Sequence, residues 1–85
     1  MRKDVVIEKL EEMCVLFYQE KDSDGCNMLN QVLPELTEII TVEIDVEKQL
    51  LLLQSLQLAL QALEAEEWIM LADIFQYELC DKLKG

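Results

Sequence analysis

Apolar residues recur at helical spacing along almost the whole chain, and this periodicity limits the fold more than any other feature of the sequence. Among 85 residues there are only two glycines and one proline, so few positions interrupt the pattern. The spacing predicts a first amphipathic helix over about 3–20, with charged residues on its other side. Its apolar face consists of Val6, Leu10, Met13, Cys14 and Phe17.

The one clear turn signal in the sequence, at 21–25, precedes a second predicted helix over about 24–41. Ser23 or Asp24 is expected to cap this helix, because either side chain can accept hydrogen bonds from its first N–H groups. Pro34 lies inside it and lacks an N–H, which predicts a bend. The apolar stripe consists of Leu29, Val32, Leu33, Leu36 and Ile40.

The segment 41–46 alternates β-branched and acidic residues and could form a short strand. A lone strand has no pairing partner in a helical chain, so we interpret the segment as a connection or an irregular helix end. Asp45 is then expected to cap a third helix over about 46–63. An acidic turn at 64–67 leads into a fourth helix over about 66–83. The fourth apolar stripe consists of Trp68, Leu71, Ala72, Phe75, Leu79 and Leu83.

Four helices with short connections favour an all-α fold, an antiparallel up-down bundle that forms one domain over 1–85. An alternative is that the second and third helices fuse, giving three longer helices that complete their core by dimerisation. Aligning the chain with itself at an offset of 43 residues yields three identities, so the sequence gives no support for two repeated hairpins.

The chain has 18 acidic and 7 basic residues, a net charge of −11 and no histidine. Nucleic acids and anionic membrane surfaces attract lysine and arginine, so neither is an expected partner. A partner with a basic segment would be attracted and oriented. The alternative interpretation is that the charge only maintains solubility.

The cysteines predict a reducing environment. The chain has three cysteines, Cys14, Cys26 and Cys80, and no two of them are close in the sequence. An odd number without short spacings argues against both a disulfide framework and a structural zinc site. The N-terminus lacks a signal-peptide pattern. The most hydrophobic stretch, 50–63, is too short and too polar to span a bilayer. We therefore expect a cytoplasmic protein.

The residues needed for catalysis are missing from the sequence. The absence of histidine removes the commonest general base and every Ser-His or Cys-His arrangement. No glycine-rich loop exists to hold phosphate. The segment 22–25 resembles part of a calcium loop, but Gln31 stands where a bidentate carboxylate is required. We expect no enzymatic activity, no cofactor and no metal.

The third predicted helix carries more apolar surface than one core requires. Its main stripe consists of Leu52, Leu53, Leu56, Ala59, Leu60 and Leu63. A second stripe, containing Leu51, Leu58 and Ala62, lies well away from the first. We interpret Leu51 and Leu58 as a self-association surface. The alternative is that this helix is packed deeply among the other three.

A second apolar surface is predicted on the fourth helix. Met70, Ile74 and Tyr77 stand at i, i+4 and i+7, opposite the core stripe, with Asp73 and Asp81 beside them. Such a surface suits a groove that binds an amphipathic helix with basic flanks. The alternatives are scattered surface hydrophobes or contact with a neighbouring helix.

Two segments resemble a group of small uncharacterised acidic all-helical proteins of Gram-positive bacteria. The segments are MLNQVLPEL at 28–36 and WIMLADIFQYEL at 68–79. The group has an LLNQ-LPEL segment followed by an LADILEYEL segment near the C-terminus. The resemblance implies an association with motility genes and a role near flagellar assembly. It implies no catalytic or ligand-binding residues.

These features together predict a non-enzymatic adaptor or chaperone-like protein that binds an amphipathic, partly basic segment of another protein. Met70, Ile74 and Tyr77 would supply apolar contacts, and Asp73 and Asp81 would orient basic flanks. The alternative is a structural or regulatory oligomer whose apolar stripes serve only itself. A sensor for a metal or small molecule is a third interpretation.

Overall fold

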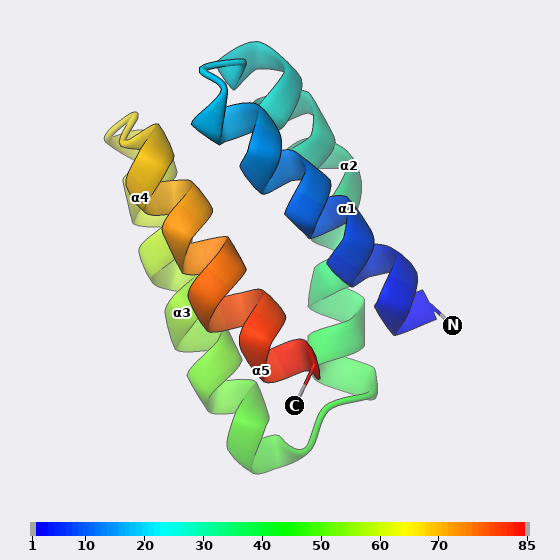
Figure 1. Ribbon diagram of the computed structural model, residues 1–85. Helices are drawn as coiled ribbons and strands as arrows, with labels where there is room; N and C mark the ends of the chain where they lie inside the picture. Colours follow the sequence, from blue (N-terminus) through cyan, green and yellow to red (C-terminus); the bar gives the residue numbers. More distant parts are fainter. Residues whose placement is uncertain (1, 85) are drawn as a thin grey trace.

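The chain folds into an antiparallel up-down bundle of helices, as the periodicity predicted (Figure 1). The computed structural model describes residues 2–84, and within that range the helices form four columns. The first three columns are α1 (Arg2–Tyr18), α2 (Asp22–Val42) and α3 (Val46–Glu64). The fourth runs without interruption through α4 (Trp68–Asp73), η1 (Ile74–Cys80) and α5 (Asp81–Lys84).

The connection at 43–45 separates α2 from α3, so the two helices are not fused and the segment is not a strand. Helix α2 continues through Pro34 rather than ending there. The expected bend at this proline stays a prediction. Asp45 directly precedes α3, as expected, although its side chain forms no capping hydrogen bond.

The predicted cap of α2 was wrong. The helix begins at Asp22, so Ser23 and Asp24 lie inside its first turn, and the residue before it is Lys21, whose side chain forms no cap. The physical reason lies in the preceding turn. There the Lys21 N–H donates to the Leu16 carbonyl at 2.9 Å, which reverses the chain within three residues through backbone bonds alone.

The α1–α2 and α3–α4 turns have the same backbone design. Glu20 and Glu66 have φ values of 62° and 57°, and they are the non-glycine residues with positive φ in the described chain. In both turns the N–H that follows the glutamate donates to a carbonyl five residues earlier, at 2.9 Å in each case. This is the Schellman arrangement, which usually has glycine at that position. The two hairpins thus correspond at an offset of 46 residues.

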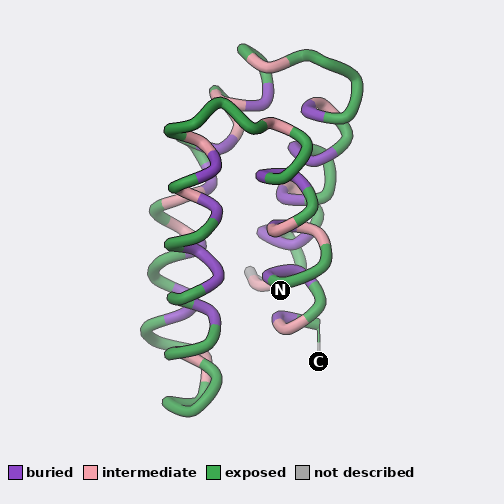
Figure 2. The backbone as a smooth tube through the Cα atoms, turned by 90° about the vertical axis from the view of Figure 1, so that its left-hand side faces the viewer, coloured by how far each residue is buried: buried purple, intermediate pink, exposed green. Residues whose placement is uncertain are grey.

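The core lies between the four columns, where the buried segments face one another (Figure 2). All five residues predicted for the apolar face of α1 are buried. In α2, Leu33 is only partly buried, and Ile39 is buried in addition to the predicted residues. In the fourth column every predicted residue is buried except Trp68, which is half-buried. The periodicity therefore identified most of the core.

Helix α3 departs furthest from its predicted stripe. Leu53 is exposed rather than buried, and Ala62 is buried although the sequence placed it on the second stripe. Leu60 and Leu63 are half-buried. The difference is one of rotation. Helix α3 packs mainly on the fourth column and approaches α2 less closely, so its core face is turned towards Ala59 and Ala62.

The middle of the fourth column, η1, is a π-helix of seven residues. In a π-helix each N–H bonds five residues back, so successive side chains are rotated less than in an α-helix. The predicted core stripe nevertheless continues through this segment, since Phe75, Leu79 and Leu83 are all buried. Across residues 2–84, every helix falls short of the length and apolarity that a membrane crossing requires.

Candidate functional site

An apolar groove lies between α3 and the start of the fourth column. Its hollow has a volume of about 370 Å³. The lining residues, which define the α3–α4 groove, are Leu58, Gln61, Ala62, Glu67, Met70 and Ile74. The groove forms because the tight turn at 65–67 folds the fourth column back against α3.

The groove unites residues that the sequence assigned to two different surfaces. Leu58 was predicted for self-association, whereas Met70 and Ile74 were predicted for partner binding, and all three line one hollow. Leu58 is 55% exposed and Met70 is 52% exposed, while Ala62 forms a buried floor between them. Exposed apolar side chains around a buried small residue leave room for an apolar side chain from another molecule.

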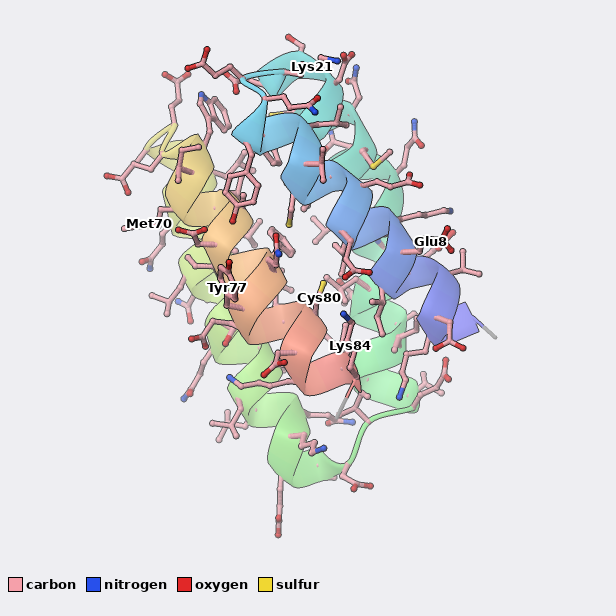
Figure 3. The ribbon with its side chains drawn as sticks, in the orientation of Figure 1. Glu8, Lys21, Met70, Tyr77, Cys80 and Lys84 are labelled. Atoms are coloured by element: carbon pink, nitrogen blue, oxygen red, sulfur yellow. The ribbon has the colours of Figure 1, made fainter. Side chains whose placement is uncertain are left out.

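Tyr77 and Leu51 lie outside the groove lining. Tyr77 is 67% exposed on η1, and Figure 3 shows it with Met70 on the side of the fourth column that faces away from α1. The lining of the groove includes Ile74 but not Tyr77, which lies farther along the same column. Leu51 is half exposed, two helical turns before Leu58 on α3.

Asp73 links the fourth column to α1. Its Oδ1 atom accepts a hydrogen bond from the Tyr18 hydroxyl. Loss of solvent around the phenol, and then this hydrogen bond, raise the pKa of Tyr18 above its usual value. Asp73 therefore lies on the side that faces α1, although it remains exposed, and Asp81 is exposed at the start of α5. Neither carboxylate lines the groove.

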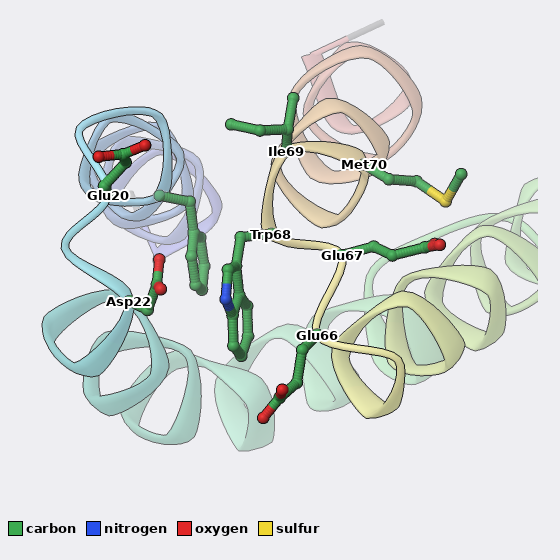
Figure 4. A pocket seen from close by; sticks show the side chains of 8 residues that line it. Glu20, Asp22, Glu66, Glu67, Trp68, Ile69 and Met70 are labelled. Carbon is green, nitrogen blue, oxygen red and sulfur yellow. The ribbon is translucent and has the colours of Figure 1, made fainter.

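A second and larger hollow opens between the two turns, where the sequence predicted no site. Its volume is about 650 Å³, and Figure 4 shows its lining side chains. The lining residues, which define the turn pocket, are Phe17, Glu20, Asp22, Glu66, Glu67, Trp68, Ile69 and Met70. Four of the eight are acidic, and two are aromatic.

The aromatic wall of the turn pocket joins the two hairpins. The rings of Phe17 and Trp68 stack with centroids 5.7 Å apart and an interplanar angle of 6°. Phe17 is fully buried because Gly25 lets α2 approach it, and a Cβ atom at Gly25 would stand 2.8 Å from the ring. Trp68 remains half-buried, so part of the indole stays open to the pocket.

Asp22 contributes a carboxylate with one oxygen out of solvent. Its Oδ1 atom is buried and has no hydrogen-bond partner among the described residues. An unpaired buried acceptor is unfavourable, since it has lost water without gaining a donor. The first turn of α2 supplies part of the compensation, because the positive end of a helix dipole stabilises a nearby anion.

Most of the basic residues with assigned contacts tie helices together. Lys84 pairs with Glu11 at 3.0 Å, and Lys9 pairs with Glu35 at 3.8 Å. Lys82 donates a hydrogen bond to Ser55 Oγ at 3.3 Å and forms an ion pair with Glu78. The Ser55 hydroxyl in turn donates to the Glu78 carboxylate. These contacts lie along the bundle rather than in the turn pocket.

The cysteines are free and their thiols are deactivated by burial. Cys14 and Cys80 are buried, which raises the pKa of the Cys14 thiol to about 12 and that of Cys80 to about 11. The Cys14 Sγ–H donates to the Ala72 carbonyl at 3.4 Å. Cys26 is half-buried, and its pKa is also raised by loss of solvent. Protonated thiols act as small hydrophobic groups and are poor nucleophiles.

The described residues form an apolar hollow and an acidic, aromatic one. From residue 2 to residue 84, no group of three histidine, cysteine, aspartate or glutamate side chains is arranged to hold a metal ion. The molecule is thus an acidic four-helix bundle in which an apolar groove lies next to an acidic, aromatic pocket. The chain belongs to the family described as "Domain of unknown function (DUF8042)", whose model matches residues 4–85. No curated protein and no solved structure matches it.

Proposed function

We propose that this protein is a non-enzymatic adaptor or chaperone-like protein that binds an amphipathic, partly basic helix of another protein in the α3–α4 groove. The observation that carries the proposal is the pairing of Leu58 with Met70 across a hollow floored by Ala62. Two antiparallel helices with apolar side chains along their seam are a common receptor for a third helix.

Charge determines what kind of helix fits. The protein carries a net charge of −11, and Glu67 stands at the end of the groove nearest the turn. Asp73 and Asp81 add exposed carboxylates farther along the same column. An acidic partner would be repelled, whereas lysine or arginine beside the apolar residues of a ligand would be attracted and oriented. Met70 suits such a role because its flexible side chain adapts to different apolar shapes.

The test uses designed peptides of about five helical turns. One peptide has leucines on one face and lysines on its flanks, and a second has glutamate in place of each lysine. We expect the basic peptide to bind and the acidic one not to bind, as measured by fluorescence anisotropy. The double variant Leu58→Gln, Met70→Gln should weaken binding of the basic peptide by about ten-fold or more.

A matched control separates the groove from general surface hydrophobicity. Val15→Gln and Val42→Gln make the same kind of change at exposed valines outside the groove, and this variant should bind the peptide like the unchanged protein. Equal loss of binding in both double variants would contradict the proposal. Equal binding of the basic and acidic peptides would contradict its electrostatic part.

The proposal extends to the process in which the partner acts. Because the segments at 28–36 and 68–79 resemble proteins associated with motility genes, we propose a partner that takes part in flagellar assembly. A strain that lacks the protein should then swim poorly and carry fewer flagella. Normal motility would remove this extension and leave the helix-binding function untouched.

Self-association is a second candidate function, favoured by the outer surface of α3. Residues 49–63 contain no charged side chain, although Leu50 is 62% exposed and Leu51, Leu53 and Leu58 are exposed beside it. In an acidic protein, a neutral apolar surface lets two copies meet without placing carboxylates together. Leu51→Glu with Leu58→Glu should abolish any dimer in light scattering while leaving helicity intact. An unchanged oligomer would rule out these residues.

A further inference from the structure

We infer that the turn pocket binds a cationic side chain, an arginine or a lysine, carried at one end of the helix that occupies the α3–α4 groove. The inference rests on the proposed function and adds a direction to it, since a pocket at one end of a groove fixes which end of the ligand lies there. It also names a recognition element that the apolar residues cannot supply.

The first argument is that the two hollows are adjacent. Glu67 and Met70 are lining residues of both. A helix that lies along α3 and α4 with its apolar face on Leu58 therefore points one end towards the turns. A long side chain from the last turn of that helix reaches the turn pocket.

The second argument is the aromatic wall. Phe17 is fully buried, so the indole of Trp68 is the ring that a ligand can contact. A cation over an indole is attracted by the negative face of the ring, and arginine adds planar stacking. The stack on Phe17 holds the indole in place, which lowers the entropy lost when a ligand binds against it.

The third argument is the excess of acidic over basic residues among those that line the turn pocket. Four acidic residues line the pocket, although the Glu67 side chain extends away from the indole of Trp68 (Figure 4), and Lys21, the basic residue of the nearer turn, is not among the lining residues. One oxygen of Asp22 is buried, so only the rest of its carboxylate is open to a ligand. A guanidinium brings five N–H donors and a positive charge, and it satisfies several carboxylates at once.

The experiment compares two basic groove-binding peptides that differ in a single residue. One carries arginine at the end that faces the turns, and the other carries citrulline, which has nearly the same shape but no charge. Trp68 is the one tryptophan in the chain, so its fluorescence reports contact at the pocket directly. We expect the arginine peptide to bind about ten-fold more tightly than the citrulline peptide.

Two variants locate the source of that difference. Glu20→Gln with Glu66→Gln removes two carboxylates from the turn pocket and should bring the two peptides to the same affinity. Glu8→Gln with Glu47→Gln removes the same charge from exposed positions outside the pocket and should preserve the preference for arginine. Equal affinities of the two peptides for the unchanged protein would overturn the inference while leaving the groove proposal in place.

A further measurement separates the inference from the proposed function. If neither peptide binds, the groove proposal fails, and the pocket is then titrated directly with N-acetylarginine amide and N-acetylcitrulline amide. A change in Trp68 fluorescence with the arginine compound alone would support a cation site that stands without the groove. No change with either compound would overturn the inference as well.

Discussion

The two helical hairpins of this bundle have the same turn but present different outer surfaces. The α3–α4 groove lies along the seam of the second hairpin, and the offset of 46 residues identifies the corresponding positions in the first. Glu12 and Asp24 there correspond to Leu58 and Met70. A seam that carries carboxylates is solvated, whereas the same seam with leucine and methionine is a surface for another apolar group.

The floor of the seam differs as well. Leu16 stands in the first hairpin where Ala62 stands in the second. Leu16 is half-buried, whereas Ala62 is buried and lines the hollow that opens between α3 and α4. The same turn thus joins hairpins whose seams carry different residues, and the α3–α4 groove lies in the second of them.

The contact between the hairpins gives the largest expected effect. Phe17→Ala removes a fully buried ring that stacks on Trp68, and it should lower the free energy of unfolding by about 3–5 kcal/mol. Leu63→Ala changes the corresponding half-buried residue of the second hairpin and should have a smaller effect. Urea unfolding followed by circular dichroism measures both. Equal losses would mean that the hairpins contribute equally to their shared contact.

A substitution that fills the hollow between α3 and α4 is expected to have an effect of intermediate size. Ala62→Leu introduces the residue found at the corresponding position of the first hairpin, so its side chain should occupy the hollow and weaken binding of the basic peptide by about ten-fold. The change adds apolar contact in an existing hollow, so stability should fall little, if at all. Unchanged peptide affinity with unchanged stability would show that the hollow is not where the peptide binds.

The smallest change in stability is expected from a substitution at the left-handed residue of the turn between α3 and α4. Glu66→Gly relieves an unfavourable left-handed conformation and removes a negative charge from the C-terminal end of a helix. Glycine makes the unfolded chain more flexible, so the net gain should be about 0.5–1 kcal/mol in thermal unfolding. Glu64→Gly, at the helical end of α3, should bring no gain. A destabilised Glu66→Gly protein would contradict this account of the turn.

The sequence predicted the four helices because their apolar periodicity is strong and few residues interrupt it. It also identified Met70, Ile74 and Leu58 as apolar excess, but it could not place them together. Which residues meet across a seam depends on how far each helix is rotated, and the burial of Ala62 with the exposure of Leu53 shows that rotation. An apolar periodicity shows which residues share one face of a helix, but it does not show towards which neighbouring helix that face is turned.

The turn pocket could not be found from the sequence for a different reason. Glu20 and Glu66 lie 46 residues apart in the sequence. They line the same hollow only because the two hairpins pack against each other. Each of them looks like an ordinary surface glutamate, because nothing in the composition of the turns signals a left-handed conformation at a non-glycine residue. Comparing the chain with itself at the offset of the two turns, rather than at half its length, would have paired them.

The π-helix in the fourth column has a consequence for how members of this family differ in length. A π-helical turn contains more residues than an α-helical turn over a similar rise, so Ile74–Cys80 holds a surplus that an ordinary helix would not need. Deletion of one residue there should convert the segment to α-helix and leave the buried residues on either side in place. Alignments of related chains should therefore show single-residue gaps inside this helix, a place where gaps are normally selected against.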